Sequence, residues 1–192
     1  MKLKVTSEII SGWEWAKRTA LRTVGKKPKT PQPTDQWKAD MLLAEHSPIR
    51  AVTYYISIDN IRQWVSVHLV RHWLGFLPFV HTQREDRRKL DLSRDELPQG
   101  SLNDMDIIAN AQALINVSRK RLCACASKET REAWQSVKES IAKIDPIMAD
   151  KMVKNCVYRG FCPEGNNCCG YSHTIQFLKD LEEYRYKVYQ NE

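Results

Sequence analysis

Arginine, histidine and hydroxyl side chains gather in one stretch of the sequence. Residues 71–73 read Arg-His-Trp and residues 82–84 read Thr-Gln-Arg, with Gly75 and Pro78 between them. A guanidinium group binds phosphate or carboxylate through two parallel hydrogen bonds. The stretch therefore predicts a site for an anionic ligand, and the alternative is a solvated charged loop. A second basic group, Arg119-Lys120-Arg121, lies on a predicted helix.

Six cysteines form the other group of reactive side chains, and four of them lie near the C-terminal end. Three thiolates and one imidazole suit a tetrahedral zinc ion. The alternatives are reduced thiols that pack a turn, and a disulfide. The pattern also resembles a Cys-Cys-Cys-His finger of the kind that binds RNA. Cys123 and Cys125 are expected on different sides of a helix, which argues against a chelating pair. The tentative zinc ligands are Cys156, Cys162, Cys169 and His173.

Composition limits the class of protein. The chain has 192 residues, of which 42% are hydrophobic and 28% charged, and its net charge is +7. These values predict one soluble globular domain over residues 1–192. No run approaches the ~18 consecutive apolar residues of a membrane helix, and the N-terminus has no apolar signal segment. We therefore expect a cytoplasmic location, reduced cysteines and no membrane partner. The modest charge disfavours a nucleic-acid partner.

Periodicity and turn residues predict the elements of the N-terminal part. Alternation over residues 1–7 predicts a short edge strand, and apolar residues three and four apart predict a helix over 8–24. Residues 25–34 carry three prolines and three lysines and are expected to form a mobile surface loop. A short helix is predicted over 35–44. β-Branched and aromatic residues predict a strand over 49–58.

The rest of the chain is predicted to be mainly helical. Asp59 is expected to cap a helix that ends between Trp73 and Gly75. Residues 74–101 form a connection longer than the ~12–15 residues usual for a loop, which favours an active-site loop. The other predicted segments are helices over 110–125 and 127–145, a Cys-rich segment over 156–173 and a C-terminal helix over 174–190.

Three segments together resemble one enzyme family. Residues 45–50 (Glu-His-Ser-Pro-Ile-Arg), 68–72 (His-Leu-Val-Arg-His) and 82–84 (Thr-Gln-Arg) occur in the order found in the flavin-dependent (alternative) thymidylate synthases, the ThyX family. The hallmark of that family reads Arg-His-Arg, two residues, Ser, one, Asn, two, Ser, one, Arg. The predicted helix from Asn110 to Arg121 is similar to a family helix with two asparagines and an arginine at the same intervals. The resemblance spans residues 45–170.

The resemblance implies a mixed α/β (α+β) fold, in which helices flank a central antiparallel sheet. It also implies a homotetramer whose active sites are shared between subunits. The implied reaction is the reductive methylation of dUMP to dTMP. FAD would be the cofactor, NAD(P)H the reductant and methylenetetrahydrofolate the carbon donor. All of these ligands are anionic, so part of the positive charge would serve to attract them.

Positions that match the family motif imply roles for residues of this chain. Arg121 and Thr82 would be catalytic. The residues that would bind the substrate are Arg71, His68, Thr82, Gln83, Arg84 and Arg121. The residues that would bind the cofactor are His46, Arg71, His72, Trp73, Asn110, Asn116 and Cys125.

The chain also departs from the family motif. Trp73 stands at the third hallmark position, where the family has an arginine that contacts flavin. The first Ser and the Asn of the hallmark are absent, and Cys125 replaces a histidine on the flavin side. Because the altered positions lie mainly on the flavin side, the alternative is a pyrimidine-nucleotide-binding relative with a different or lost reaction.

Overall fold

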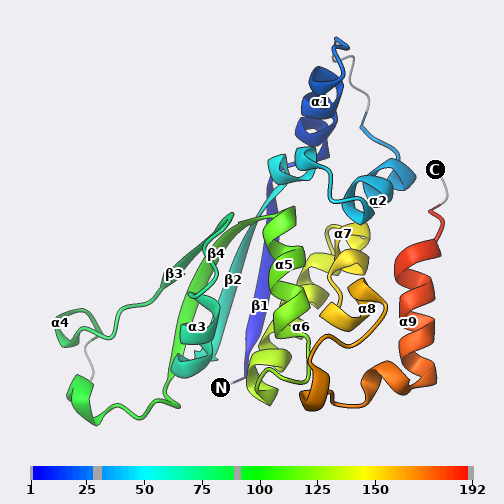
Figure 1. Ribbon diagram of the computed structural model, residues 1–192. Coiled ribbons are helices and arrows are strands. Elements are labelled where there is room, and N and C mark those ends of the chain that lie inside the picture. Colours follow the sequence, from blue (N-terminus) through cyan, green and yellow to red (C-terminus); the bar gives the residue numbers. More distant parts are fainter. Residues whose placement is uncertain (1, 28–31, 89–91, 190–192) are drawn as a thin grey trace.

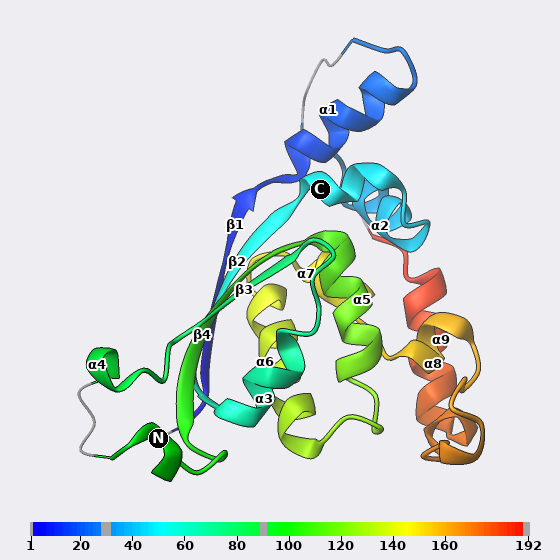
Figure 2. The ribbon, with the colours of Figure 1, turned by 60° about the vertical axis from the view of Figure 1, so that its left-hand side comes forward.

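The computed structural model describes residues 2–27, 32–88 and 92–189. A four-stranded antiparallel sheet lies at its centre, and helices cover one face of the sheet (Figure 1; Figure 2). The strands lie in the order β1-β2-β4-β3. They are β1 (Lys4–Ser11), β2 (Thr53–Arg62), β3 (Phe76–Val80) and β4 (Leu102–Asn110). The mixed α/β class with a central antiparallel sheet is therefore confirmed.

Alternation of side chains explains the two central strands. Tyr54 and Ile56 of β2 are fully buried, and they are paired with the buried Ala109 and Ile107 of β4. The residues between them point to the other face of the sheet. Aromatic and β-branched side chains suit such a half-buried pleated surface. The helices thus pack on a continuous apolar face.

Most helix starts follow from local capping. The α-helices are α1 (Trp13–Thr23), α2 (Asp35–Leu43), α3 (Gln63–Leu69), α4 (Glu85–Arg88), α5 (Ala111–Arg121), α6 (Lys128–Ala142), α7 (Pro146–Lys151), α8 (Asn155–Arg159) and α9 (Ile175–Tyr186). The side chains of Thr34, Asn110 and Ser127 each accept a hydrogen bond from a backbone N–H in the first turn of α2, α5 and α6. α3, α5 and α6 lie next to the sheet, and α8 and α9 lie outside them (Figure 2).

A buried carboxylate joins three parts of the main core. Asp145 precedes α7, and its Oδ2 accepts hydrogen bonds of 2.6 Å from both the indole N–H of Trp13 and the hydroxyl of Tyr54. Its Oδ1 accepts a third from the backbone N–H of Met148 at 3.1 Å. A buried carboxylate is costly unless it is hydrogen-bonded. These bonds therefore fix α1, β2 and α7 relative to one another.

The C-terminal part contains a small apolar core of its own. Cys156 and Val157 of α8 pack with Phe177 and Tyr184 of α9. Nearby, the buried Lys151 donates a hydrogen bond from Nζ to the backbone carbonyl of Tyr184 at 2.6 Å. This core holds the Cys-rich segment, which connects α8 to α9, against the rest of the protein.

Two expectations for the N-terminal part need correction or extension. The strand predicted over 1–7 is confirmed as an edge of the sheet, but it extends to Ser11. The helix predicted over 8–24 begins only at Trp13, because residues 8–11 pair with β2. Pairing in the sheet therefore overrides the helical spacing of apolar residues at these positions.

The predicted helix cap at Asp59 is wrong. Asp59 lies within β2, which continues past an irregularity in its pairing with β4. α3 begins after that strand and ends at Leu69, so it does not reach the predicted end between Trp73 and Gly75. The strand predicted over 49–58 is confirmed in its later part.

The connection predicted over 74–101 is not a plain loop. It contains β3, α4 and a 3-10 turn at Arg94–Glu96, and it leads directly into β4. Neither strand is among the elements predicted from the sequence. Pro78 weakens the strand signal of β3, whereas in β4 the acidic Asp104 and Asp106 alternate with the buried Met105 and Ile107, which is the pattern of a half-buried strand. A proline is tolerated in β3 because this strand is at the edge of the sheet.

The remaining predicted helices are present with narrower bounds. The helices predicted over 110–125, 127–145 and 174–190 correspond to α5, α6 and α9. Residues 28–31 of the loop predicted over 25–34, and residue 190, lie outside the described residues. Within the described parts of the chain, no helix combines the length and the apolar character that crossing a bilayer requires.

Candidate functional site

The end of α5 meets the end of α3 and the segment after it at three residues, here termed the His–Arg cluster: His68, His72 and Arg121. Arg121 is the last residue of α5, and its Nη2 donates a hydrogen bond to the backbone carbonyl of His68 at 2.5 Å. Its Nε donates to Nε2 of His72 at 3.0 Å. A guanidinium group has five N–H donors. Two of them orient the side chain, and among the described residues Nη1 donates no hydrogen bond, so it is open to a ligand.

His72 is held in its neutral form. It accepts a hydrogen bond at Nε2, so its ring proton is on Nδ1. Burial, and then the positive charges of Arg121, Arg71 and Lys120, lower the pKa of His72 to about 4. Its ring packs edge-on against Phe76. The positive charges of Arg121, Arg71 and Lys120 therefore lie around a neutral imidazole, which favours an anionic ligand.

His68 connects α3 to α6. Its Nδ1 lies 3.1 Å from Oγ1 of Thr130, and its ring packs edge-on against Trp64. Thr130 is buried and also accepts a hydrogen bond from the hydroxyl of Ser127 at 2.8 Å. The side chain of His68 thus has a structural partner, and its backbone carbonyl is the group that orients Arg121. The partner Thr130 is not identified from the sequence.

The two arginines at the end of α5, Arg119 and Arg121, contact different parts of the protein. Arg119 forms an ion pair with Glu45, and its guanidinium lies 3.4 Å from the ring centroid of Tyr158. Gln112 Nε2 also donates to Glu45, at 2.5 Å. Residues two apart on a helix differ by about 200° in direction, so Arg119 and Arg121 face opposite ways. Arg119 therefore stabilises the packing of α5, and only Arg121 belongs to the His–Arg cluster.

Asn110, which the resemblance assigns to the cofactor, has a structural role at the start of α5. Its side-chain Oδ1 accepts a hydrogen bond from the backbone N–H of Ala113 at 2.9 Å. The backbone N–H of Asn110 donates a hydrogen bond to the backbone carbonyl of Gly75 at 3.0 Å. Gly75 has a φ of 68°, and a Cβ at this position would overlap the Asn110 side chain. Asn110 and Arg121 lie at opposite ends of α5, about 16 Å apart at 1.5 Å per residue. Only an extended ligand would reach both.

Thr82, Gln83 and Arg84 lie on a projecting segment, here termed the arm (residues 81–88 and 92–101). The arm extends away from the helical layer (Figure 1). Arg84 forms two hydrogen bonds with Asp86, at 3.0 and 2.8 Å, and both side chains are exposed. The arm follows Val80, the last residue of β3, whereas His72 lies just before Phe76, the first residue of that strand. One chain therefore does not bring these three residues to the His–Arg cluster.

Three other predicted residues lie at the surface. His46 is exposed and lines a cavity of about 400 Å³ beside α1 and α2. Asn116 is exposed, and its Oδ1 accepts a hydrogen bond from Arg119 at 3.3 Å. Trp73 is 73% exposed in the segment after α3, beside the exposed Arg71.

The predicted zinc ligands do not gather in one place. Cys156 lies on α8 and points into the small apolar core, whereas Cys169 and His173 are exposed. In the parts of the chain that the structure describes, no three of these residues bring their ligand atoms within 4.8 Å of one another. The sequence spacing therefore does not translate into a common centre. The four zinc ligands predicted from the sequence are Cys156, Cys162, Cys169 and His173.

A different trio does gather, here termed the thiol cluster: Cys123, Cys125 and Glu164. Two sulfur atoms and one carboxylate oxygen lie within 4.8 Å of one another. The expectation that the two cysteines lie on different sides of a helix is wrong, because α5 ends at Arg121 and both cysteines lie in the turn after it. Lost hydration, then the charge and hydrogen bond of Cys123, raise the pKa of Cys125 to about 11, and the charges of Glu164 and Cys169 act in the same direction.

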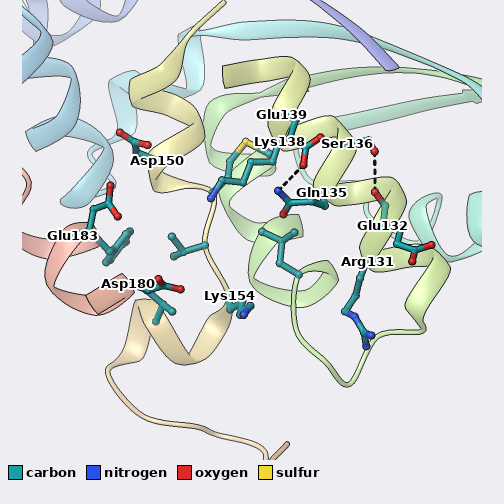
Figure 3. Close-up of a pocket in the computed structure, with 15 residues that line it drawn as sticks. Arg131, Glu132, Gln135, Ser136, Lys138, Glu139, Asp150, Lys154, Asp180 and Glu183 are labelled. Atoms are coloured by element: carbon teal, nitrogen blue, oxygen red, sulfur yellow. Dashed lines mark hydrogen bonds between the residues drawn. The ribbon is translucent and has the colours of Figure 1, made fainter. Parts of the chain in front are cut away.

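A cavity of about 680 Å³ lies between α6, α9 and the segment around Lys154 (Figure 3). Lys138 of α6 extends toward the side where Asp150 and Glu183 lie. The lining carries both positive and negative charges, and it includes none of the residues predicted for nucleotide, cofactor or zinc. The cavity therefore shows no preference for an anion, and the His–Arg cluster remains the candidate site.

Comparisons with known proteins bear on the fold. No protein-family model matches the chain, and no curated protein matches it. Two similar solved structures are crystal structures of thymidylate synthase X (ThyX) from Helicobacter pylori, each with FAD and dUMP. Their TM-scores are 0.60 and 0.65 at 12% sequence identity, and the similarity covers 79% of this chain and 99% and 100% of theirs. The chain therefore has the fold of these ThyX structures, as the resemblance implies.

Proposed function

We propose that this chain is a flavin-dependent enzyme that reductively methylates dUMP to dTMP, with methylenetetrahydrofolate as carbon donor and NAD(P)H as reductant. One observation carries the proposal. Arg121 is oriented by His72 and by the carbonyl of His68, in the fold of ThyX structures that contain FAD and dUMP. An oriented guanidinium among further cations suits an anionic nucleotide.

Arg121 would bind the pyrimidine edge of dUMP. Its two hydrogen bonds within the chain orient the guanidinium in advance, so little conformational freedom is lost when the nucleotide binds. A fixed positive charge at this place stabilises negative charge that develops on the carbonyl oxygens of the ring. Neutral His72 would offer its Nδ1 proton as a hydrogen-bond donor.

The phosphate of dUMP would be bound by the arm of a neighbouring subunit. Thr82, Gln83 and Arg84 provide a hydroxyl, an amide and a guanidinium, but they lie on the arm, which follows the end of β3 far from the segment that holds His72. A homotetramer with shared sites would bring an arm from one chain to the cluster of another. Arg84 would then exchange the carboxylate of Asp86 for phosphate.

The residues beside the His–Arg cluster fit FAD in part. Arg71 offers an exposed cation for a diphosphate, and Trp73 offers an exposed flat surface for a ring system. Bound flavin would supply the two-electron reduction that methylation requires. Asn110 and Cys125 are engaged in the helix cap and the thiol cluster, so they are less suited to hold the cofactor.

The second candidate function is binding of a pyrimidine nucleotide with a different or lost reaction. Trp73 favours it, because it replaces an arginine on the flavin side while Arg121 is present at the nucleotide side. Both candidates share the nucleotide site and differ in the flavin.

Absorbance spectra of the purified protein, before and after addition of FAD and dUMP, separate the two candidates. The first expects flavin that stays bound through gel filtration, and dTMP formed when all co-substrates are present. Binding of dUMP without flavin and without dTMP would replace it with the second. If neither FAD nor dUMP binds, both are contradicted. Arg22→Ala, an exposed change on α1, serves as the control and is expected to bind as the wild type does.

A further inference from the structure

The thiol cluster joins two segments that are far apart in the sequence. Cys123 and Cys125 lie in the turn after α5, and Glu164 lies in the Cys-rich segment between α8 and α9. A hydrogen bond of 3.8 Å from Cys125 Sγ to the carbonyl of Asn167 connects the same two segments. The cluster therefore lies where the end of α5 contacts the C-terminal part of the chain.

The spacing of the three ligand atoms is close to that of a metal centre. Two sulfurs and a carboxylate oxygen lie within 4.8 Å of one another. In a tetrahedral zinc site with bonds of about 2.0–2.3 Å, neighbouring ligand atoms are about 3.5–3.8 Å apart. The three groups need to approach by only about 1 Å to reach that geometry.

We propose that Cys123, Cys125, Glu164 and Cys169 bind a structural zinc ion. The first three are the residues whose ligand atoms lie together, and Cys169 is proposed as the fourth ligand because it is an exposed thiol five residues after Glu164 in the same segment. Thiolates select zinc over the harder magnesium and calcium ions, and zinc accepts a carboxylate among its ligands. Binding would release the three thiol protons to solvent.

Packing alone does not account for this arrangement. Cys156 is an example of a cysteine whose role is apolar packing, since it is buried among Val157, Phe177 and Tyr184. Cys125 is exposed instead, and it shares its surroundings with a carboxylate. A carboxylate beside two sulfurs contributes nothing to apolar packing. A cation gives all three groups a common partner.

The other cysteines of the segment have local partners. Cys162 is partly buried and packs against the small apolar core. The sulfur of Cys168 lies 3.5 Å from the hydroxyl of Ser172 and accepts a hydrogen bond from the N–H of Gly170 at 3.4 Å. These contacts shape the turn, so we do not assign Cys162 or Cys168 to the metal.

The proposed ion would fix the position of Arg121. Cys123 follows Arg121 by two residues, so a metal bond at Cys123 holds the end of α5 against the Cys-rich segment. The inference concerns the stability of this contact and does not depend on the reaction proposed above.

Zinc content tests the proposal. The full chain, purified under reducing conditions without chelator, is expected to contain one zinc ion per chain by elemental analysis and by native mass spectrometry. Cys123→Ser and Cys125→Ser are expected to lose it. Glu164→Gln is expected to bind zinc at least about tenfold more weakly. With Co²⁺ in place of zinc, thiolate charge-transfer absorbance is expected in the wild type and not in the two serine variants.

His173→Ala is the matched control, because His173 belongs to the zinc set expected from the sequence but not to the set proposed here. It is exposed and is expected to keep its zinc, whereas Cys169→Ser is expected to lose it. Three results would overturn the proposal: a wild-type chain that takes up no zinc, zinc content unaffected by Cys123→Ser, or a Cys123–Cys125 disulfide in the purified protein. Circular dichroism of each variant confirms that lost zinc does not reflect lost fold.

Discussion

The His–Arg cluster and the arm carry two arginines of one proposed site in opposite physical settings. Arg121 is held by two hydrogen bonds within its own chain, one of them to a neutral His72. Arg84 is exposed, and among the described residues its side chain pairs only with Asp86, two residues away. Arg121 is therefore part of the fold as well as of the site. Arg84 contributes little to the fold, and its role depends on what approaches the arm.

Arg121→Ala is expected to have the largest effect. It removes the donors to His72 and to the His68 carbonyl, which lowers the free energy of unfolding by about 2 kcal/mol, or about 4–8 °C in Tm. It is also expected to abolish dUMP binding. Thermal unfolding and calorimetric titration with dUMP measure the two effects. An unchanged Tm would mean that Arg121 is not part of the fold, and Arg22→Ala is the reference for a surface arginine.

Arg84→Ala is expected to separate binding from stability. Because exposed ion pairs contribute about 0–1 kcal/mol, its Tm should match that of the wild type. Its affinity for dUMP should fall about 10–100-fold, since a charged hydrogen bond to phosphate is lost. Mixing Arg84→Ala and Arg121→Ala chains sharpens the comparison. If sites are shared between subunits, mixed assemblies should regain some dUMP binding, and failure to regain any would contradict sharing.

The pH dependence of stability tests the neutral state of His72 and is the smallest expected effect. The pKa of His72 is about 4 in the folded chain, whereas an unfolded histidine has a pKa near 6.5. As the pH falls from about 6.5 toward 4, the unfolded chain binds a proton that the folded chain does not, so stability decreases. We expect a loss of about 1–2 kcal/mol, after allowance for solvent screening at this half-exposed ring.

Thermal unfolding between pH 4 and pH 7 measures this loss. His72→Asn removes the titrating group and should flatten the curve over that range, whereas Arg22→Ala, an exposed change on α1, should leave the shape of the curve as in the wild type. Parallel curves for the wild type and His72→Asn would show that His72 is not the group responsible.

The sequence predicts those elements whose signals are local. α2, α5 and α6 start at capping residues, and the alternation of β2 matches its buried face. Residues 8–11 and Asp59 are mispredicted because pairing with a distant strand decides their conformation. In β3 the edge proline Pro78 weakens the local strand signal. β4 does carry a local signal, because Asp104 and Asp106 alternate with the buried Met105 and Ile107, so this strand could have been predicted.

Only part of the candidate site can be predicted from the sequence. The helical spacing of Arg119 and Arg121 separates their directions by about 200°. The sequence alone could therefore predict that they face opposite sides of the helix. The contact between Arg121 and His72 depends on the path of the chain from α3 to β3, which no local pattern specifies. The thiol cluster is missed because α5 ends at Arg121, without a glycine or proline to mark the end.

Asp145 has a consequence for how the chain folds. Its partners Trp13 and Tyr54 lie 132 and 91 residues away in the sequence. Contacts of such separation cost loop-closure entropy before they contribute any stability. A half-assembled core would leave the carboxylate without partners, and burying it then is disfavoured. We therefore expect the start, the middle and the later part of the chain to acquire their native core together, in one cooperative step.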